Sequence, residues 1–318
     1  MGDSSSKEGS DEKNTDNKTE ASDRTAAGVA KIRHIETILN VEGDEARLFE
    51  DAYAEYFYTG SSVVNMLCGK WFMNTVSNDR DLAMVYLLTG RTREFDERVR
   101  AAARAGIKQI VILGAGYDTR GFRLDLPDDV LIFEVDQPDV QAKKKAGLEA
   151  IKQAGLELRN EQNVHFVPCD FNVEDITKLK DVPKYNPSVA TLFTLEGVTQ
   201  YIPKEATSST LKAAGSVCGS GSQFVISYVP QDLYDAPEKV FDPQSIKEML
   251  SQVESMGEPW ISGWHQNEFA SFMRQNGFKV QRDISIEELV KEYYQPASRQ
   301  VPENQQAMYE RYAWATKG

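Results

Sequence analysis

Glycine and acidic residues follow directly after apolar, β-branched runs, which is where a doubly wound sheet binds its ligands. The run QIVIL (109–113) is followed by Gly114, Ala115, Gly116 and Asp118. Glycines in such a turn let the backbone approach a ligand closely. A dinucleotide fingerprint would need another glycine at position 119, where this chain has threonine. The turn therefore indicates a ligand without a pyrophosphate, and a plain strand-to-helix turn is the alternative.

An acidic residue closes the next apolar run. Asp136 ends FEVD (133–136), 20 residues after Gly116, and Gln137 follows it. A carboxylate at this place can accept two hydrogen bonds from a ribose diol, each worth roughly 1.5–3 kcal/mol. A helix cap is the alternative role for Asp136. A glycine turn together with this acid indicates a nucleoside without a pyrophosphate, and S-adenosylmethionine fits that description.

Two further strand ends carry candidate residues. Asp170 and Phe171 follow VHFVPC (164–169), where a carboxylate can accept from an adenine amino group while a ring packs beside it. Glu196 follows ATLFTL (190–195), and its charge would favour a sulfonium or an amino group nearby. A capping or structural carboxylate is the alternative for Glu196.

The order of elements needed to position these residues is readable from periodicity. Apolar runs alternate with amphipathic stretches, which predicts an α/β domain with a doubly wound, mostly parallel sheet. Helical periodicity over 31–105 predicts a cap before the first strand, and 231–265 interrupts the alternation as an insertion over the carboxyl edge of the sheet. The expected strands are 109–113, 130–136, 164–170, 190–197, 222–229, 278–282 and the final residues, and the expected helices between them include 141–155 and 203–217.

Charge and composition exclude several classes of protein. The chain has 318 residues and a formal net charge of −13, which speaks against a nucleic-acid or anionic-lipid partner. Residues 1–30 hold four basic and seven acidic residues and are expected to form a disordered acidic tail, leaving 31–318 as one domain. Neither a secretory signal nor a membrane-spanning run is found, and three scattered cysteines indicate neither a disulfide framework nor a metal site. A cytoplasmic protein without a metal is expected.

Six segments together resemble the leucine carboxyl methyltransferase family. They are GRTREFD (90–96), VILGAGYDTRGFRL (111–124), FEVDQP (133–138), VPCDF (167–171), LEGVTQYI (195–202) and YAWATKG (312–318). The resemblance covers about residues 45–318. It implies a class I methyltransferase fold with a seven-stranded sheet, and S-adenosylmethionine as the methyl donor.

The resemblance also implies a role for each matching residue. Arg91 would pair with the methionine carboxylate, with Arg93 as its competitor and a surface salt bridge as the alternative for either. Gly114 and Gly116 would line the methionine moiety, Asp136 would hold the ribose, Asp170 and Phe171 would flank the adenine, and Glu196 would lie near the amino-acid portion. Ala115, Asp118 and Gln137 complete the expected cofactor-binding set.

The expected reaction is an in-line methyl transfer in which positioning supplies most of the catalysis. A carboxylate acceptor is ionised at neutral pH and needs no base, whereas a phenol or an amine would be helped by one. Tyr201 and His265 are the weak catalytic candidates. Aromatic residues in the cap and the insertion could close the site as a lid, although core packing is the favoured role for each: Tyr53, Tyr56, Phe57, Tyr58, Trp260 and Trp264.

The acceptor is expected to be a small molecule methylated on a carboxylate or hydroxyl oxygen, because the LEGVTQYI segment is similar to that of small-molecule members of the family. Methylation of the C-terminal leucine of a phosphatase catalytic subunit is the alternative, since the WATKG ending is similar to that of the protein methylase. A non-catalytic nucleoside-binding module and a nicotinamide-dependent dehydrogenase are the more remote alternatives. The sequence carries no signal for an oligomeric state.

Overall fold

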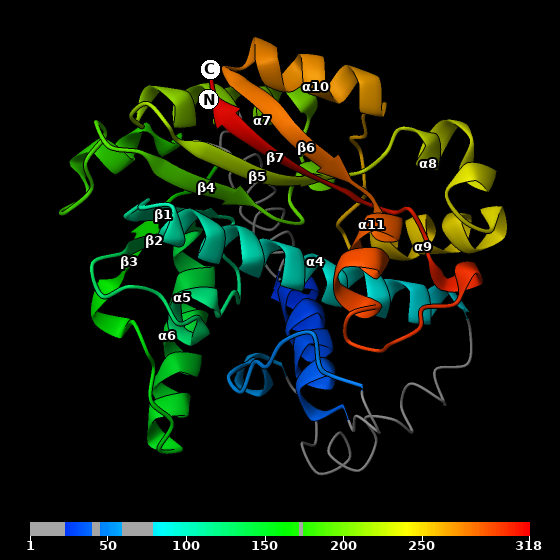
Figure 1. Cartoon of the computed structure of the whole chain (residues 1–318), viewed down its shortest axis with the longest axis horizontal. Coiled ribbons are helices and arrows are strands. Elements are labelled where there is room, and N and C mark those ends of the chain that lie inside the picture. Colours follow the sequence, from blue (N-terminus) through cyan, green and yellow to red (C-terminus); the bar gives the residue numbers. More distant parts are fainter. Residues whose placement is uncertain (1–22, 40–44, 59–78, 172–173) are drawn as a thin grey trace, which may run out of the picture.

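The seven apolar runs pair into one sheet in the order β3-β2-β1-β4-β5-β7-β6 (Figure 1). Neighbouring strands from β3 to β5 are parallel, while β7 is antiparallel to both β5 and β6. The mostly parallel, doubly wound sheet is thus confirmed. Its strands are β1 (Gln109–Leu113), β2 (Leu131–Asp136), β3 (Val164–Pro168), β4 (Thr191–Leu195), β5 (Gln223–Tyr228), β6 (Phe278–Ile284) and β7 (Arg311–Lys317).

This computed structural model describes residues 23–39, 45–58, 79–171 and 174–318. Residues 1–22 of the expected tail lie outside the described residues, as do residues 40–44 and 59–78 of the predicted helical cap (31–105). The described helices are α4 (Asp79–Arg104), α5 (Arg120–Arg123), α6 (Pro138–Gln153), α7 (Lys204–Ser216), α8 (Asp232–Asp235), α9 (Pro243–Ser255), α10 (Gln266–Gln275) and α11 (Ile286–Leu289). Short 3-10 turns include Ala54–Phe57 and Thr199–Tyr201, and a π-helical segment covers Val290–Tyr294.

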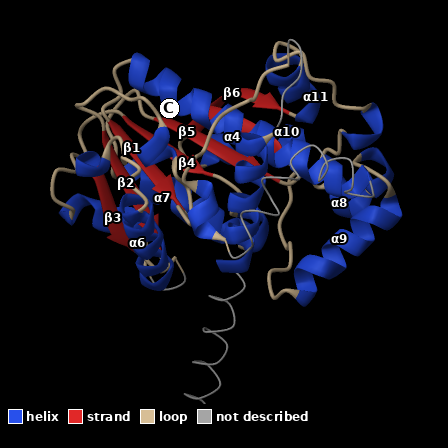
Figure 2. Ribbon diagram, turned by 90° about the horizontal axis from the view of Figure 1, so that it is seen from below, coloured by secondary structure: helices blue, strands red, loops and turns tan. Residues whose placement is uncertain are grey.

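Helices cover both faces of the sheet (Figures 1 and 2). The strand side chains belong to two apolar layers, one on each face. Ile110 and Ile112 of β1 join the layer that contains residues of α4 and α6, whereas Val111 and Leu113 join the layer with α7 and α10. Strand side chains alternate between faces because each successive Cβ points to the opposite side. A parallel sheet covered on both faces needs continuous apolar strands, and β1 is buried at all five positions.

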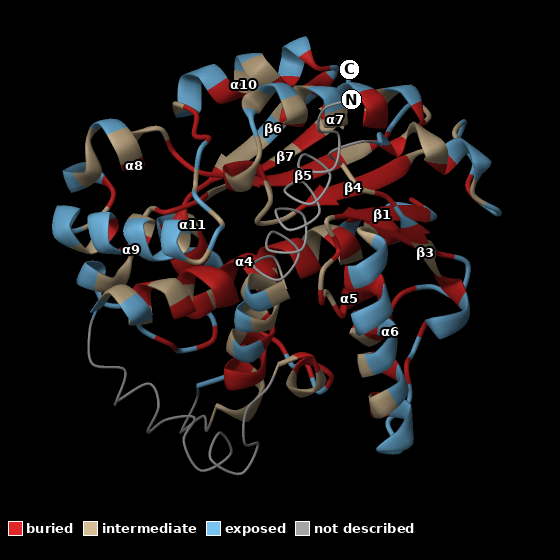
Figure 3. Ribbon diagram, turned by 180° about the vertical axis from the view of Figure 1, so that it is seen from behind, coloured by how far each residue is buried: buried red, intermediate tan, exposed pale blue. Residues whose placement is uncertain are grey.

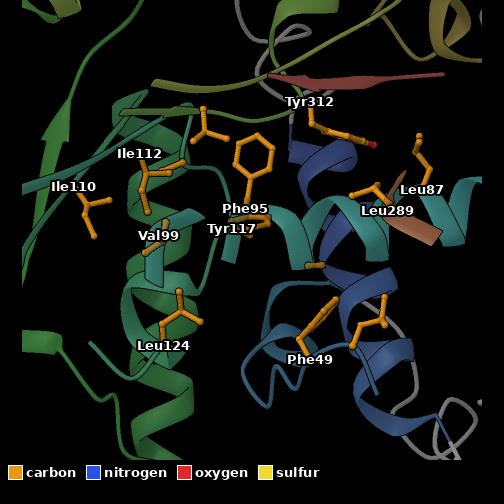
Figure 4. Close-up of a cluster of buried hydrophobic side chains, with 14 of the residues drawn as sticks. Phe49, Leu87, Phe95, Val99, Ile110, Ile112, Tyr117, Leu124, Leu289 and Tyr312 are labelled. Carbon is orange, nitrogen blue, oxygen red and sulfur yellow. The ribbon is translucent and has the colours of Figure 1, made fainter. Parts of the chain in front are cut away.

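The helix α4 contributes much of the first layer. Figure 4 shows Phe95 and Val99 of this helix with Ile112 of β1 in the same apolar cluster. Phe95 has no exposed surface, and burying a side chain of that size contributes roughly 1.5–3 kcal/mol. In Figure 3 the outer faces of the covering helices are exposed while the central strands β1, β4 and β5 are buried. The helix is therefore fixed firmly enough to hold polar residues at a defined place near the sheet.

The first described helix covers residues 23–38, so the expectation of a disordered tail through residue 30 is wrong for its last eight residues. Ala30 is completely buried, and Ala26 and Ala27 pack against the first apolar layer. Small alanines can form a helix and pack closely even though none of them carries a large apolar side chain. In the sequence this segment shows no core residues, because the residues that it buries are small alanines.

The segment 231–265, predicted as an insertion, follows β5 and contains α8 and α9. Asp242 caps α9, because its carboxylate accepts from the backbone N–H of Ser245. The returning chain is attached to the loop after β4, where Ile261 N donates to Gln200 O over 2.7 Å. The insertion is therefore anchored at the carboxyl edge of the sheet.

The described helices were also compared with the length and hydropathy that a bilayer requires. None of them is both long and apolar enough to span a membrane.

Candidate functional site

The glycine turn, residues 114–118 after β1, has a backbone that only glycine adopts easily. Gly114 and Gly116 have φ of +65° and +43°. A Cβ on Gly114 would lie 2.8 Å from Cγ2 of Val198. The N–H groups of Gly114 and Ala115 both donate to the carbonyl of Val135, which holds the turn against the end of β2. The positive φ therefore favours glycine at both positions, and at Gly114 the nearby Val198 side chain also leaves no room for a Cβ.

Asp136 joins the glycine turn to the end of β2. Its carboxylate accepts from Gly116 N over 2.5 Å and from Gln137 N over 2.7 Å. Gln137, rather than Asp136, is the residue at the N-cap of α6. Burial raises the pKa of Asp136, while the two backbone N–H groups oppose that shift. The carboxylate thus lies where the sequence predicted it, beside the turn, and not as the residue at the helix cap.

Arg91 lies at the centre of a second group of polar residues. From α4 its Nε donates to Glu196 Oε1 over 2.9 Å, and its Nη1 lies 2.9 Å from both carboxylate oxygens of Glu310. Gly197, with φ of +65°, lets the guanidinium lie against the chain, since a Cβ there would be 3.1 Å from Nη1. Burial lowers the pKa of Arg91, but Glu310 and Glu196 raise it more. Arg91 is therefore a permanently charged, immobilised cation.

The competing Arg93 points elsewhere. It donates to the carbonyl of Leu48 over 2.8 Å and pairs with Glu97 one helical turn away at 3.1 Å. About a third of its side chain is exposed, against 7 % for Arg91. The structure thus brings Arg91, and not Arg93, to the strand ends.

Arg120 connects the two groups. Its Nη1 lies 2.8 Å from Glu196 Oε2 and 2.5 Å from Asp118 Oδ2, and its Nε donates to Asp96. Burial raises the pKa of Glu196, but the charges of Arg120 and Arg91 lower it further, so that the net shift is downward. Asp118, expected at the cofactor, therefore belongs to an ion-pair network whose members are Arg91, Arg120, Glu196, Glu310, Asp96 and Asp118 (the Arg91 network).

Sequence reasoning missed three members of the Arg91 network, namely Asp96, Arg120 and Glu310. Arg120 stood inside the GAGYDTR segment, but the segment was interpreted mainly through its glycines. Glu310 precedes β7 by one residue and is 219 positions away from its partner Arg91. The signal available in the sequence was a carboxylate directly before the final strand pattern, RYAWATK. The structure shows that this residue is buried, with 1 % exposed.

The end of β3 lies next to Asp136, because Cys169 N donates to Asp136 O over 2.8 Å. Asp170 and Phe171 follow; Asp170 N donates to Glu174 Oε2 over 3.2 Å, and Phe171 packs against the second apolar layer. Cys169 is fully buried, and burial raises its pKa to about 11. This agrees with its interpretation as a small core residue rather than a nucleophile.

The two weak catalytic candidates lie in different surroundings. Tyr201 ends the turn after β4, its ring meets Trp260 edge-on at 6.4 Å, and burial raises its pKa to about 12. His265 occupies the N-cap position of α10 without a side-chain capping hydrogen bond, and its ring faces carboxylates of α8, at 4.0 Å from Asp232 and 3.7 Å from Asp235. Within the described part of the chain, His265 makes no contact with the Arg91 network, so the structure does not bring it there.

The expected lid aromatics are mostly packed in the core. Tyr53, Phe57 and Trp264 are buried, and Phe57 stacks on Tyr117 with the ring centroids 5.2 Å apart. Tyr56 and Tyr58 are partly buried against the first apolar layer, and so is Trp260. Core packing, the favoured interpretation, thus describes their contacts.

The helix 23–38 covers the glycine turn instead. The Tyr117 hydroxyl donates to Asp23, whose carboxylate also pairs with Lys143 of α6 at 2.9 Å. A Cβ on Gly116 would lie 3.5 Å from that of Ala26. Further along, Thr25 donates to Glu258 of the insertion. One helix therefore contacts the turn, α6 and the insertion at the same edge of the sheet.

Comparison with known proteins gives these features a family. A sequence model of leucine carboxyl methyltransferases matches residues 26–215. The chain belongs to the leucine carboxyl methyltransferase family. It is an S-adenosylmethionine-dependent methyltransferase: its relatives are named as such, and its fold is the class I methyltransferase fold.

The relatives include bacterial proteins. One from Mycolicibacterium gilvum, named "Putative S-adenosyl-L-methionine-dependent methyltransferase", is 36 % identical over 143 residues, 45 % of each chain. Another of the same name, from Mycobacterium marinum, is 28 % identical over 86 % of this chain and 88 % of its own. A crystal structure of a DUF574 family protein from Streptomyces avermitilis superposes with a TM-score of 0.55 at 12 % identity, covering 84 % of this chain and 95 % of that one. This last likeness concerns the fold alone.

Proposed function

We propose that this methyltransferase transfers the methyl group to a carboxylate or hydroxyl oxygen of a small-molecule acceptor. The observation that carries the proposal is the Arg91 network, in which Arg91 and Arg120 are both ion-paired with Glu196 after β4, Arg91 also pairs with Glu310 before β7, and, within the described residues, no histidine takes part. An acceptor that is ionised at neutral pH suits such a site, because it needs no base.

The residues present fit the methyl donor. The positive φ of Gly114 and Gly116 allows the backbone to approach a ligand, and the Asp136 carboxylate beside them is the group that a ribose diol would bind. Arg91 would hold the methionine carboxylate, Glu196 would lie near the amino-acid portion, and Asp170 and Phe171 would flank the adenine. Ala115 and Gln137 would contribute backbone, and Asp118 would act through Arg120.

Bound S-adenosylmethionine would supply an electrophilic methyl group for transfer to the acceptor oxygen, with its sulfur as the leaving group. The chain's own task is to hold the acceptor in line with that bond. Tyr201 and Trp260 lie at the loop after β4 and the returning insertion, where an acceptor would be oriented. The helix 23–38 would exclude water from the glycine turn, which favours the reaction of an anion with a cation.

The test uses S-adenosylmethionine with a labelled methyl group, incubated with the protein and either a small-metabolite extract or a peptide that ends in leucine. Mild base then releases methanol from an ester and leaves an ether intact. We expect labelled small molecules in the extract, and methanol if the acceptor is a carboxylate. Labelling of the peptide alone would replace the proposal with its protein-methylating alternative, and a product labelled on nitrogen would contradict it.

Two variants on the same helix control this assay. Arg91→Met removes the cation of the Arg91 network and should abolish the labelled product. Arg93→Met removes a cation two residues away that pairs with Glu97 on the helix surface, and it should leave the product in place. An equal loss of labelled product in both variants would mean that the substitutions disrupt α4, and that the loss does not reflect removal of the Arg91 guanidinium.

A further inference from the structure

Glu310 is a buried carboxylate with an unusually specific set of partners. It is 1 % exposed, at the residue just before β7. Both of its oxygens lie 2.9 Å from Nη1 of Arg91, and Oε1 also accepts from Nε2 of Gln200 over 3.3 Å. Burying a charge in this way is a poor source of stability, since desolvation offsets much of the attraction. The geometry that Glu310 imposes on Arg91 and Gln200, its two closer partners, is therefore its more informative property; the Tyr312 hydroxyl lies farther from Oε2, at 3.5 Å.

The first partner is left with one nitrogen to offer. Glu196 takes Nε of Arg91 and Glu310 takes Nη1, so that Nη2 has no hydrogen-bond partner among the residues that the structure describes. A guanidinium with two of its three nitrogens fixed cannot rotate, and it presents the N–H groups of the third in a set direction. A guanidinium nitrogen held in this way is suited to binding the carboxylate of a ligand.

The second partner is left with an oxygen to offer. A carboxylate accepts and does not donate, so the amide of Gln200 must turn its NH₂ group toward Glu310. Its Oε1 is then buried and unpartnered within the described chain, on a residue that is 2 % exposed. A buried polar atom without a partner costs free energy, which a ligand that donates a hydrogen bond would recover.

We propose that Glu310 is a positioning residue for the amino-acid end of the methyl donor, because it sets a donor on Arg91 and an acceptor on Gln200 beside the same carboxylate oxygen. This pair is complementary to a zwitterion, whose α-carboxylate would meet Nη2 and whose α-ammonium would meet Oε1. The inference rests on the cofactor site proposed above. Glu310 itself does not touch the reacting atoms.

The test compares two nucleosides that differ in this end alone. S-adenosylhomocysteine carries the amino acid, and 5′-methylthioadenosine lacks it. Their dissociation constants are measured by titration calorimetry for the wild type and for Glu310→Gln. We expect the variant to bind S-adenosylhomocysteine about tenfold more weakly, the loss of one charge-assisted contact, and to bind 5′-methylthioadenosine within about twofold of the wild type.

A matched control is available on the neighbouring strand. Asp283 of β6 is also a largely buried carboxylate, bonded to Arg311 and Tyr228 outside the Arg91 network. Asp283→Asn should change the two affinities equally or not at all. If Glu310→Gln does not fold, Gln200→Met keeps the Arg91–Glu310 pair and removes Oε1, and it should lose several-fold in affinity for S-adenosylhomocysteine alone.

The outcomes separate the two proposals. A wild type that binds neither nucleoside would remove the cofactor site and this inference with it. A wild type that binds both, with a Glu310→Gln variant that loses both equally or neither, would overturn the role of Glu310 and leave the cofactor site standing.

Discussion

The Asp136 carboxylate accepts a hydrogen bond from the backbone N–H of Gly116, so a side chain as well as the Val135 carbonyl ties the glycine turn to the end of β2. We expect Asp136→Ala to weaken the binding of S-adenosylhomocysteine about tenfold or more, because it removes an anchor for the ribose and loosens the turn. Calorimetry measures the effect. Asp139→Ala, an exposed acid in the first turn of α6, is the control and should bind normally. Normal binding by the Asp136 variant would contradict the ribose role.

Gly114 is the second position at which a single methyl group should matter. Gly114→Ala places a Cβ 2.8 Å from Val198 at a φ of +65°, and we expect it to lower the free energy of unfolding by roughly 1–3 kcal/mol. Urea unfolding measures this. Gly28→Ala adds the same methyl group in the helix 23–38, where nothing lies within 4 Å, and should raise stability by about 0.5–1 kcal/mol.

The double variant Gly114→Ala/Val198→Ala separates the two causes. It removes the steric contact and keeps the unfavourable φ. We expect the free energy of unfolding to recover only in part. Complete recovery of this free energy would show that the backbone angle at position 114 is not strained.

Glu134 on β2 should make stability depend on pH. Its carboxylate is 2.6 Å from Lys144 Nζ, and both side chains are buried. Burial raises the pKa of Glu134 from an ordinary 4.5 to about 7, with Lys144 opposing and Asp118 and Asp136 adding to the rise. The folded state then holds this proton more tightly than the unfolded chain does. The stability that protonation contributes is present below pH 4.5 and is lost as the pH rises through about 7.

The measurement is urea unfolding of the wild type and Glu134→Gln at about pH 5 and about pH 8. Relative to the variant, the wild type should lose up to roughly 3 kcal/mol across this interval. Glu149→Gln, an exposed acid on α6, serves as the control and should show no such divergence. A constant difference between wild type and Glu134→Gln would mean that Glu134 titrates as in an unfolded peptide.

Tyr117 should control how firmly the helix 23–38 covers the turn. Tyr117→Phe removes the hydroxyl that donates to Asp23 while keeping the ring stacked on Phe57. We expect faster amide hydrogen exchange in residues 23–30 and little change in α4. Lys152→Ala, which removes an exposed ion pair further along α6, is the comparison. Unchanged exchange in the helix would show that the Tyr117 hydroxyl is not needed to hold it, and that the alanine packing and the remaining contacts, such as Thr25 with Glu258, are sufficient.

Much of the fold could be predicted from local pattern. β1 was predicted to the residue, because QIVIL is continuous, apolar and ended by glycine. The carboxylates at the ends of β2 and β4 were also expected, since parallel strands place their carboxyl ends at one edge. The helix 23–38 was missed in part because alanine gives little apolar signal, although Ala30 is fully buried.

The Arg91 network could not be derived in the same way. Arg91 and Glu310 meet only because β7 is inserted beside β5, and no local periodicity reports a contact across 219 residues. The sequence does specify residue types at strand ends; which of them pair, and which nitrogen is left for a ligand, depends on the packing of α4 against the sheet.

The placement of β7 between β5 and β6 has a consequence for synthesis of the protein. While residues 79–284 are emerging from the ribosome, β6 has no partner strand and Arg91 has no Glu310. The nascent chain can assemble the glycine turn early, but the amino-acid end of its proposed donor site waits until the strand Arg311–Lys317 has left the exit tunnel. A ribosome stalled before that point would carry a chain whose sheet lacks the strand between β5 and β6 and whose proposed donor site lacks Glu310.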